Sequence, residues 1–386
     1  MTGGAKRPGY FCPVHEPGKP LRILVVGQTP PPFGGQAVMI ANLLAGKFER
    51  IRLFHVRMAF SADMQSVGKF AMGKVWKLFT TILAVWWARF RYRTPVLYYP
   101  PSGPNRIPVL RDIILLCSTR WLFSKVVFHF HAGGVSGFEP HLSAPLRFFF
   151  RRAYRKPALS IRTAPQNPED GRQLGAQRDV VIPNGIEDAR ALVNRRTTKP
   201  GEPLVILFAG VLVESKGVRV LLEAFDQLLK KGVNARLEMM GKWNDEELRA
   251  WSTEFIRTKE LGAHVRFLGV LRDREKYERF ADCDVFCFPS YFEAESFGLV
   301  LVEAMQFGKP LVSTRWRGIP SVLEDGVNGY LVPVQDPQAV AGRLFELAGD
   351  PALRMRMGAE GERIFGERFT LEAFHRSMEE ELAKLA

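Results

Sequence analysis

The sequence predicts an α/β protein in which two Rossmann-like domains, each built on a parallel sheet, face a central cleft. Three observations lead to this prediction. The chain has 386 residues, of which 46% are hydrophobic, so it is long enough to bury two separate cores. Short apolar runs that suit buried parallel strands alternate with helical patterns in both halves. A polar, charged stretch at residues 187–203 divides the halves and is expected to be a linker.

Residues 21–186 are expected to form the N-terminal domain. They open with LRILVVG at residues 21–27, an apolar run typical of a buried strand, and close with the turn signal PNGI at residues 183–186. The other strands are expected at residues 52–56, 96–99, 125–130, 158–161 and 180–182. Residues 1–20 are rich in glycine and proline and have no apolar signal-peptide core, which predicts a disordered extension.

Two places at the carboxyl ends of these strands could hold a ligand. Gly34 and Gly35 precede a helix, so their amides could meet a phosphate or a hydroxyl, although glycine also serves the turn geometry of any doubly wound fold. His131 follows the strand at residues 125–130, at the sheet edge where open α/β sheets bind ligands. A single histidine there is more often structural, and His129, on the same face of the strand, is the alternative.

The second domain is expected over residues 204–365, followed by a C-terminal helix at residues 366–386. Its strands are expected at residues 204–209, 235–240, 265–269, 284–288 and 311–314. Lys216 stands in the loop between the first of these strands and a helix. A flexible ammonium there could neutralise charge on a leaving diphosphate, and the alternative is a solvated loop lysine.

The stretch PSYFEAESFGLVLVEAMQFGKP, residues 289–310, predicts a ligand-holding loop that leads into a helix. The helix is expected from about residue 297 to 307 with Ser296 as its cap. Glu295 and Glu303 bracket the helix start, as suits a ligand with phosphates between hydroxyl-rich rings. The alternative is that one glutamate complements the helix dipole and the other lies on a wet face. The amides expected to lack helical partners and to attract an anion are those of Phe297, Gly298, Leu299 and Val300.

The spacing of Glu295 and Glu303, and the GKPLVST run that follows, resembles the donor-site signature of retaining GT-B glycosyltransferases of family 4. The resemblance covers most of residues 204–365 and, more loosely, residues 21–186. It implies transfer of a sugar, with retention, from a nucleotide diphosphate sugar to a hydroxyl of a glycan or lipid-linked acceptor, in polysaccharide or glycolipid synthesis. A GT-B epimerase or phosphorylase is the alternative enzyme.

The resemblance also implies roles for single residues. Glu295 would contact the transferred sugar and Glu303 the ribose hydroxyls, while the amides of residues 297–300 meet the sugar and the diphosphate. Lys216 would bind the diphosphate, and His131 would touch the sugar near the reaction centre. The first domain would bind the acceptor and the second the donor, with the loop of Gly34 and Gly35 facing the cleft and the C-terminal helix crossing back to the first domain.

The sequence departs from the family pattern at the diphosphate. Val211 stands where many members carry a second cation, an arginine, and Arg315 and Arg317 are the candidates to replace it. Arg317 and Ser321 also depart from the usual G-G-I-P-E. No D-x-D motif stands where a donor diphosphate would need a metal. We therefore expect metal-independent transfer and no cofactor, with Lys216 and the helix amides acting in place of a divalent cation.

The charge is divided unevenly between the halves. Residues 1–186 hold 26 lysines and arginines against 8 acidic residues, whereas residues 187–386 hold 28 against 32. Two basic-aromatic segments, 69–93 and 147–156, could lie on an anionic membrane surface. The uncharged core of the first, residues 78–88, is shorter than the ~20 residues of a spanning helix. The alternatives are a helix that packs on its own sheet, and nucleic acid as the partner. The scattered cysteines favour a cytoplasmic location, on the inner face of the plasma membrane if the protein is peripheral.

Overall fold

The structure is a computed structural model that describes residues 18–31, 34–58, 72–194 and 201–386. Most of the expected N-terminal extension and residues 195–200 of the expected linker thus lie outside the described residues. The chain forms two compact units. The first comprises Met1–Ile161, Glu169–Val180 and His375–Ala386, and the second comprises Arg162–Pro168 and Val181–Phe374.

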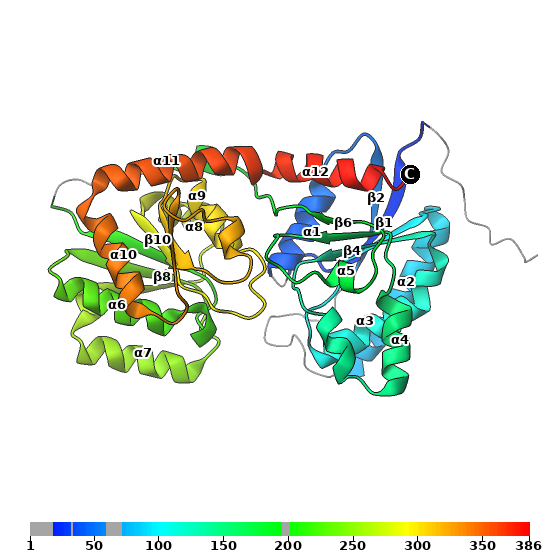
Figure 1. Cartoon of the computed structure of the whole chain (residues 1–386), viewed down its shortest axis with the longest axis horizontal. Coiled ribbons are helices and arrows are strands. Elements are labelled where there is room, and N and C mark those ends of the chain that lie inside the picture. The colour runs from blue at the N-terminus through cyan, green and yellow to red at the C-terminus, as the bar shows by residue number, and fades with distance from the viewer. Residues whose placement is uncertain (1–17, 32–33, 59–71, 195–200) are drawn as a thin grey trace, which may run out of the picture. The chain divides into compact units, whose positions relative to one another are not determined.

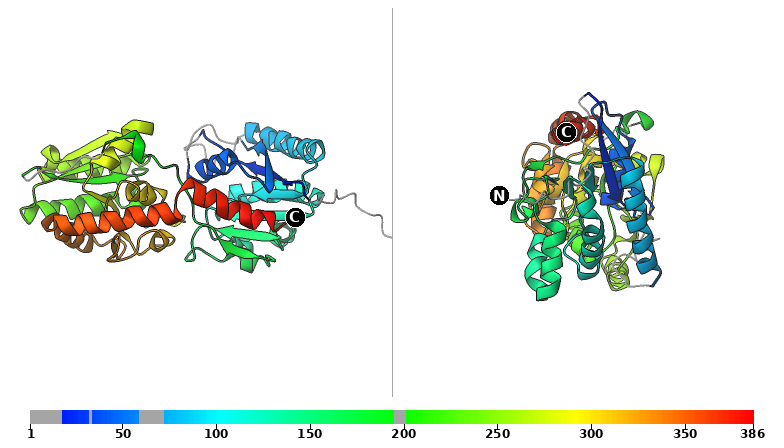
Figure 2. Two further views of the ribbon diagram at one scale, coloured as in Figure 1. Left: turned by 90° about the horizontal axis from the view of Figure 1, so that it is seen from above. Right: turned by 90° about the vertical axis from the view of Figure 1, so that its right-hand side faces the viewer.

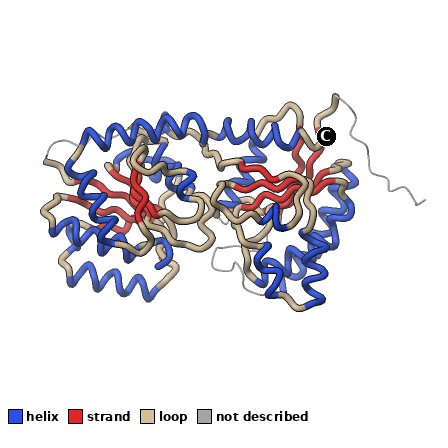
Figure 3. Tube along the Cα trace, in the orientation of Figure 1, coloured by secondary structure: helices blue, strands red, loops and turns tan. Residues whose placement is uncertain are grey.

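The first unit is built on a six-stranded sheet of order β2-β1-β3-β4-β5-β6. The pairs β1–β2, β1–β3 and β3–β4 are parallel, as the alternation of strands and helices predicts. Figure 3 distinguishes these strands from the helices around them. The strands are β1 (Leu21–Gly27), β2 (Ile51–Arg57), β3 (Val96–Tyr99), β4 (Lys125–Phe130), β5 (Leu159–Arg162) and β6 (Asp179–Val181).

Three helices of the first unit, α2, α3 and α4, cover one face of this sheet (Figure 1). Alternate strand residues such as Leu24, Leu97 and Phe128 face these helices, since successive side chains of a strand point to opposite faces. The helices of this unit are α1 (Gly35–Ala45), α2 (Met72–Arg91), α3 (Arg106–Thr119), α4 (Ala144–Tyr154) and the short α5 (Asp170–Gln173), with 3-10 turns η2 (Arg120–Leu122) and η3 (Ser136–His141).

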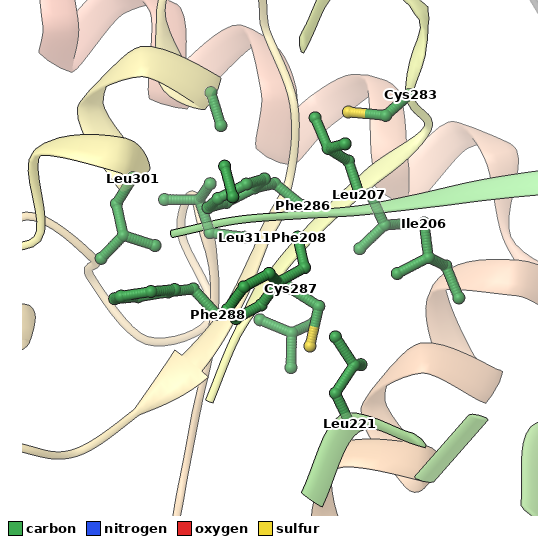
Figure 4. Packing of buried hydrophobic residues seen from close by; sticks show 14 of the residues in the cluster. Ile206, Leu207, Phe208, Leu221, Cys283, Phe286, Cys287, Phe288, Leu301 and Leu311 are labelled. Atoms are coloured by element: carbon green, nitrogen blue, oxygen red, sulfur yellow. The ribbon is translucent and has the colours of Figure 1, made fainter. Parts of the chain in front are cut away.

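The second unit is built on another six-stranded sheet, of order β12-β11-β10-β7-β8-β9, in which every neighbouring pair is parallel. Figure 4 shows Phe208, Phe286 and Phe288 packed around its central strands, with the ring centroids of Phe208 and Phe288 5.8 Å apart. The strands are β7 (Leu204–Ala209), β8 (Ala235–Met240), β9 (Val265–Gly269), β10 (Val285–Phe288), β11 (Leu311–Thr314) and β12 (Gly329–Val332).

The helices of the second unit include α6 (Val218–Lys230), α7 (Glu246–Thr258), α8 (Asp273–Asp282), α9 (Leu299–Met305), α10 (Pro337–Gly349) and α11 (Pro351–Arg368). The last helix, α12 (Leu371–Ala383), begins in the second unit and ends in the first. Within the first unit, the Glu379 carboxylate accepts hydrogen bonds from the amides of Glu49 and Arg50, both at 2.7 Å. Glu381 pairs with Arg178 there.

Residues 181–194, split in our sequence prediction between the first domain and a linker, belong to the second unit. Two contacts explain this. The amide of Ala189 donates to Gln306 Oε1 at 2.8 Å, and Arg190 pairs with Glu362 at 2.9 Å. Gly185 also lies so close to Thr370 that a Cβ there would stand 2.4 Å from the Thr370 carbonyl oxygen. Arg190, one of the charged residues that predicted a linker, thus binds the second unit through its side chain.

Candidate active site

The centre of the second sheet is where its chain order reverses, because β7 lies beside β10. Open α/β sheets bind ligands outside the carboxyl ends of the strands at such a switch point. The loop after β7 carries Lys216 and the loop after β10 carries Glu295. Gly217 allows these two loops to touch: its φ is 81°, and a Cβ there would stand 2.2 Å from the Pro289 carbonyl oxygen.

Lys216 and Glu295 form an ion pair. Lys216 Nζ lies 2.5 Å from Glu295 Oε2, and the two side chains are only 16% and 11% exposed. The Ser290 hydroxyl donates to the same carboxylate oxygen at 3.2 Å. The ammonium also lies 4.3 Å from the ring centroid of Phe292, as in a cation–π contact. From the sequence, Lys216 and Glu295 were expected to bind the same ligand. Their ion pair with each other was not predicted.

Glu303 lies on α9 and also has a lysine partner. Lys276 Nζ, from α8, donates to Glu303 Oε1 at 2.7 Å. Burial lowers the pKa of Lys276, but the charge and the hydrogen bond of Glu303 outweigh burial and raise it above its usual value. Glu303 is therefore not on a wet face: its side chain is 18% exposed. Sequence reasoning missed Lys276, since nothing in the charged pattern of α8 marks one lysine among its neighbours.

The start of α9 differs from the prediction. The helix is Leu299–Met305 rather than 297–307, and its N-cap is Gly298, not Ser296. Gly298 has φ 78° and ψ 58°, a left-handed conformation that glycine adopts without strain, so the chain turns there and the helix cannot begin earlier. The amides of Phe297 and Gly298 therefore belong to the preceding loop, while those of Leu299 and Val300 open the helix.

Ser296 contributes its main chain instead of a capping side chain. Its carbonyl accepts hydrogen bonds from Asn167 Nδ2 at 2.9 Å and from Thr163 Oγ1 at 3.2 Å. Gly318 packs against the same carbonyl, where a Cβ would stand 1.9 Å from the oxygen. Two segments far from this loop in sequence, residues 163–167 and the chain at Gly318, thus hold the loop before α9. Thr163 and Asn167 could not be recognised from the sequence, because a hydrogen bond to a main-chain carbonyl leaves no pattern in the sequence.

His131 belongs to the first unit, where it directly follows β4. It is buried, and its ring lies against that of His129 with centroids 4.0 Å apart and the ring planes tilted by 34°. Tyr98 Oη lies 2.5 Å from His129 Nδ1, so His129 is held by a second side chain. The Nε2 atoms of both histidines are buried without a hydrogen-bond partner. Burial lowers the pKa of His131 to about 3, so its imidazole ring is neutral near pH 7.

Gly34 and Gly35 also lie in the first unit, and they too follow the carboxyl end of a strand, β1. Gly34 is the N-cap of α1 in an extended conformation, with no side-chain cap. Helix α1 follows β1, which lies beside β3 where the chain order of this sheet reverses. Residues 32 and 33 of the same loop are outside the described residues. The first amides of α1 have no acceptor within the helix itself.

The comparisons with known proteins address the second unit most directly. Residues 190–364 match the family model of glycosyl transferases group 1. This part of the chain is a group 1 glycosyl transferase module. A phosphatidyl-myo-inositol mannosyltransferase of Mycobacterium leprae is 35% identical over 184 residues, 47% of this chain and 47% of that protein. A D-inositol 3-phosphate glycosyltransferase of Corynebacterium kroppenstedtii is 35% identical over 193 residues, 47% of this chain and 42% of that protein. The chain thus spans about half the length of the curated relatives it matches.

Solved structures match nearly the whole chain in fold. Anabaena Alr3699/HepE in complex with UDP has a TM-score of 0.71 at 19% identity, with 94% of this chain and 100% of that chain covered. The apo form of the lipopolysaccharide outer core galactosyltransferase WaaB has a TM-score of 0.68 at 14% identity, with 95% and 100% covered. These likenesses and the two parallel sheets confirm the predicted two-domain α/β fold of the GT-B class.

In this group 1 module, the two candidates for the cation that Val211 does not supply differ sharply. Arg315 is 61% exposed and pairs with Asp325 at 2.8 Å. Arg317 has φ 47°, which is strained for a residue with a side chain, and its Nε is buried without a hydrogen-bond partner. Its neighbour Gly318 donates from its amide to the Glu295 carbonyl at 3.4 Å. Arg317 is therefore the better candidate.

Metal binding has no visible site in the part of the chain that the structure describes. Among those residues, no group of three or more His, Cys, Asp or Glu side chains could hold a metal ion. Likewise, no described helix is long and apolar enough to cross a membrane.

Proposed function

We propose that the protein is a retaining glycosyltransferase that moves a sugar from a nucleoside diphosphate sugar to a hydroxyl of a glycan or lipid-linked acceptor, in cell-surface polysaccharide or glycolipid synthesis. The observation that carries the proposal is the Lys216–Glu295 ion pair beside the start of α9. The names of two similar proteins, a phosphatidyl-myo-inositol mannosyltransferase and a lipopolysaccharide outer core galactosyltransferase, support the acceptor class.

The ion pair suggests how the donor is received. Without donor, Lys216 and Glu295 neutralise each other in a largely buried place. A diphosphate carries more negative charge than one carboxylate, so it can take over the ammonium of Lys216. Glu295 is then free to accept hydrogen bonds from hydroxyls of the transferred sugar. One cation thus holds the leaving group, and the released carboxylate holds the sugar.

The remaining candidates complete the binding of the donor. In this proposal one oxygen of Glu303 accepts the two ribose hydroxyls, while Lys276 pairs with the other oxygen and balances its charge. The amides of residues 297–300 and the side chain of Arg317 offer donors to the diphosphate. In the first unit, His131 in its neutral form offers a hydrogen bond to the sugar, and the amides at Gly34 and Gly35 offer a site for a phosphate or an acceptor hydroxyl. Transfer by these groups needs neither a metal nor a cofactor.

The proposal is tested by a thermal-shift panel of nucleoside diphosphates and their sugars, followed by product analysis. A ligand at a hundredfold excess over its Kd should stabilise the protein by about 2.7 kcal/mol. The anomeric configuration of the product, read by NMR, tests retention. An epimerase would change the donor sugar with no acceptor present, and a phosphorylase would need inorganic phosphate. If no nucleoside diphosphate or nucleotide sugar shifts the unfolding temperature, the proposed function is wrong.

A further inference from the structure

Helix α2 presents a broad apolar face to solvent. Trp76, Trp87 and Phe90 are 67%, 60% and 65% exposed, which is unusual for side chains of this size. Other apolar side chains on this face are Phe79, Leu83 and Trp86. At about 100° per residue, all six fall within an arc of about 100°. The exposed face is therefore continuous along α2.

The opposite side of α2 is the side that packs on the sheet. Val85 and Ala88 are fully buried there, with Leu78 and Ile82 partly buried against the same core. A helix that served only to cover its own sheet would carry polar residues on its outer side. The alternative offered by the sequence, a helix with charged ends packed on its sheet, explains the inner side of α2 but not the outer one.

The apolar surface continues from α2 onto its neighbours. The rings of Trp86 and Trp121 meet edge to face at 5.8 Å, and both indole N–H groups donate to the Ser118 carbonyl at 3.0 Å. The polar edge of each indole is thus satisfied inside the protein, and the apolar part of the ring faces out. Phe148 and Phe149 of α4 are also exposed. Helix α3 packs against both α2 and α4, which Figure 2 shows as neighbouring helices. We call the exposed apolar side chains of α2 and α4, together with Trp121, the aromatic face.

The surroundings of the aromatic face are strongly basic. Residues 72–156 hold fourteen lysines and arginines against two acidic residues, Asp112 and Glu139. Neither of these acidic side chains is free to repel an anionic partner. Asp112 is buried and accepts hydrogen bonds from Tyr99 and Tyr154, while Glu139 pairs with Arg151 at 2.5 Å. At one end of α4, Arg152, Arg155 and Lys156 are all exposed.

We infer that the aromatic face docks on the surface of an anionic lipid bilayer, with α2 lying in the plane of the interface. Tryptophan and phenylalanine rings on one side of a helix enter the boundary between headgroups and acyl chains, and the lysines and arginines around them bind lipid phosphates. A nucleic-acid surface would need the cations but not a stripe of exposed aliphatic and aromatic side chains. This inference goes beyond the proposed function and does not depend on it, because the surface lies within the first unit and binds lipid without turnover.

The test is flotation of the full chain with vesicles of phosphatidylcholine alone and with added phosphatidylglycerol, at low and high salt. We expect binding to the anionic vesicles at low salt. Replacing Trp76, Phe79 and Trp87 by serine should release the protein. Neutralising Arg152, Arg155 and Lys156 should weaken binding about a hundredfold. A matched control replaces Phe345 and Met355, which are 46% and 70% exposed on the second unit, by serine and should bind as the wild type does.

A second readout separates insertion from attraction to the surface. Phosphatidylcholine brominated on its acyl chains should quench the tryptophan fluorescence of the wild type, and the quenching should fall in Trp76→Phe/Trp87→Phe. The inference is overturned if the wild type stays soluble with anionic vesicles at low salt, or if the serine variant floats equally well. It is also overturned if the serine substitutions abolish retention on polynucleotide, or abolish a concentration-dependent dimer, without affecting vesicle binding.

Discussion

The ammonium of Lys216 and the carboxylate of Glu295 lie 2.5 Å apart, at the carboxyl ends of the two strands where the second sheet reverses its chain order. Both residues have roles in the proposed reaction, and neither can perform its role while bound only to the other. The donor must therefore replace one partner of each. Because of this competition, the affinity for the diphosphate should change when either partner is substituted.

Lys216→Ala should lower turnover by roughly a hundredfold or more, because the leaving diphosphate loses a preorganised cation. Initial rates of nucleoside diphosphate release measure the effect. The control is Lys230→Ala, which removes another lysine that is paired with a carboxylate, Asp226, but lies on α6 and is 63% exposed. Full activity of Lys216→Ala without added metal would mean that another cation stabilises the leaving diphosphate.

Glu303→Ala should weaken donor binding by about 1.5 to 3 kcal/mol if its carboxylate accepts the ribose hydroxyls. The specific test compares a donor with its 2′-deoxy analogue. The wild type should lose affinity for the analogue, whereas the variant should bind both equally, since the missing hydroxyl and the missing carboxylate belong to one interaction. An unchanged preference for the ribose form in the variant would exclude this role. Lys276→Met removes the partner of Glu303 but keeps the carboxylate. It therefore shows whether the effect of Glu303→Ala comes from the lost carboxylate or from the lost ion pair.

Arg317→Gly separates stability from binding. Arg317 holds a left-handed backbone at φ 47°, which costs roughly 1 to 2 kcal/mol for a residue with a side chain. Glycine at this position removes that cost. This gain in stability offsets the loss that glycine causes by giving the unfolded chain more conformational freedom. The unfolding temperature should therefore not fall, while the affinity for a nucleoside diphosphate should. Equal affinity in both proteins would leave Lys216 as the cation of the diphosphate site.

The stability of the protein should depend on His131 between pH 7 and 5. The pKa of this histidine is lowered from 6.5 to about 3 by burial, so the unfolded chain binds a proton that the folded chain does not. The free energy of unfolding therefore falls as pH falls below 6.5. His131→Gln should lose about 2 kcal/mol less than the wild type over this interval. Denaturant unfolding at both pH values measures the difference, and His141→Gln, on the surface, is the control. Equal losses in wild type and His131→Gln would mean that His131 is accessible to protons.

Much of this architecture could be predicted from the sequence, because buried parallel strands are apolar runs of recognisable length. Strand β12 was missed, since GYLV begins with glycine, a residue that is depleted in strands. The start of the second unit differs from the prediction, because nothing in the local sequence shows that Ala189 and Arg190 bind Gln306 and Glu362. Local sequence does not encode such distant partners.

The candidate site shows the same limit. Spacing alone marked Glu295 and Glu303, and loop position marked Lys216. The partners that set their charge state and position, Lys276 among them, come from segments that pack together only in the fold. The start of α9 was misplaced because Ser296 is a good capping residue, whereas the left-handed turn at Gly298 decides where the helix begins.

The most direct test of the account is the affinity of Glu295→Gln for a nucleoside diphosphate and for its sugar, measured by calorimetry beside the wild type. Removing the carboxylate charge frees Lys216 from its competing partner, so the free diphosphate should bind about three- to tenfold more tightly than to the wild type. The additional affinity contributed by the sugar should shrink at the same time, and turnover should fall. If the variant binds the diphosphate no more tightly than the wild type and keeps the full contribution of the sugar, then Glu295 neither competes for Lys216 nor holds the sugar, and the central claim is contradicted.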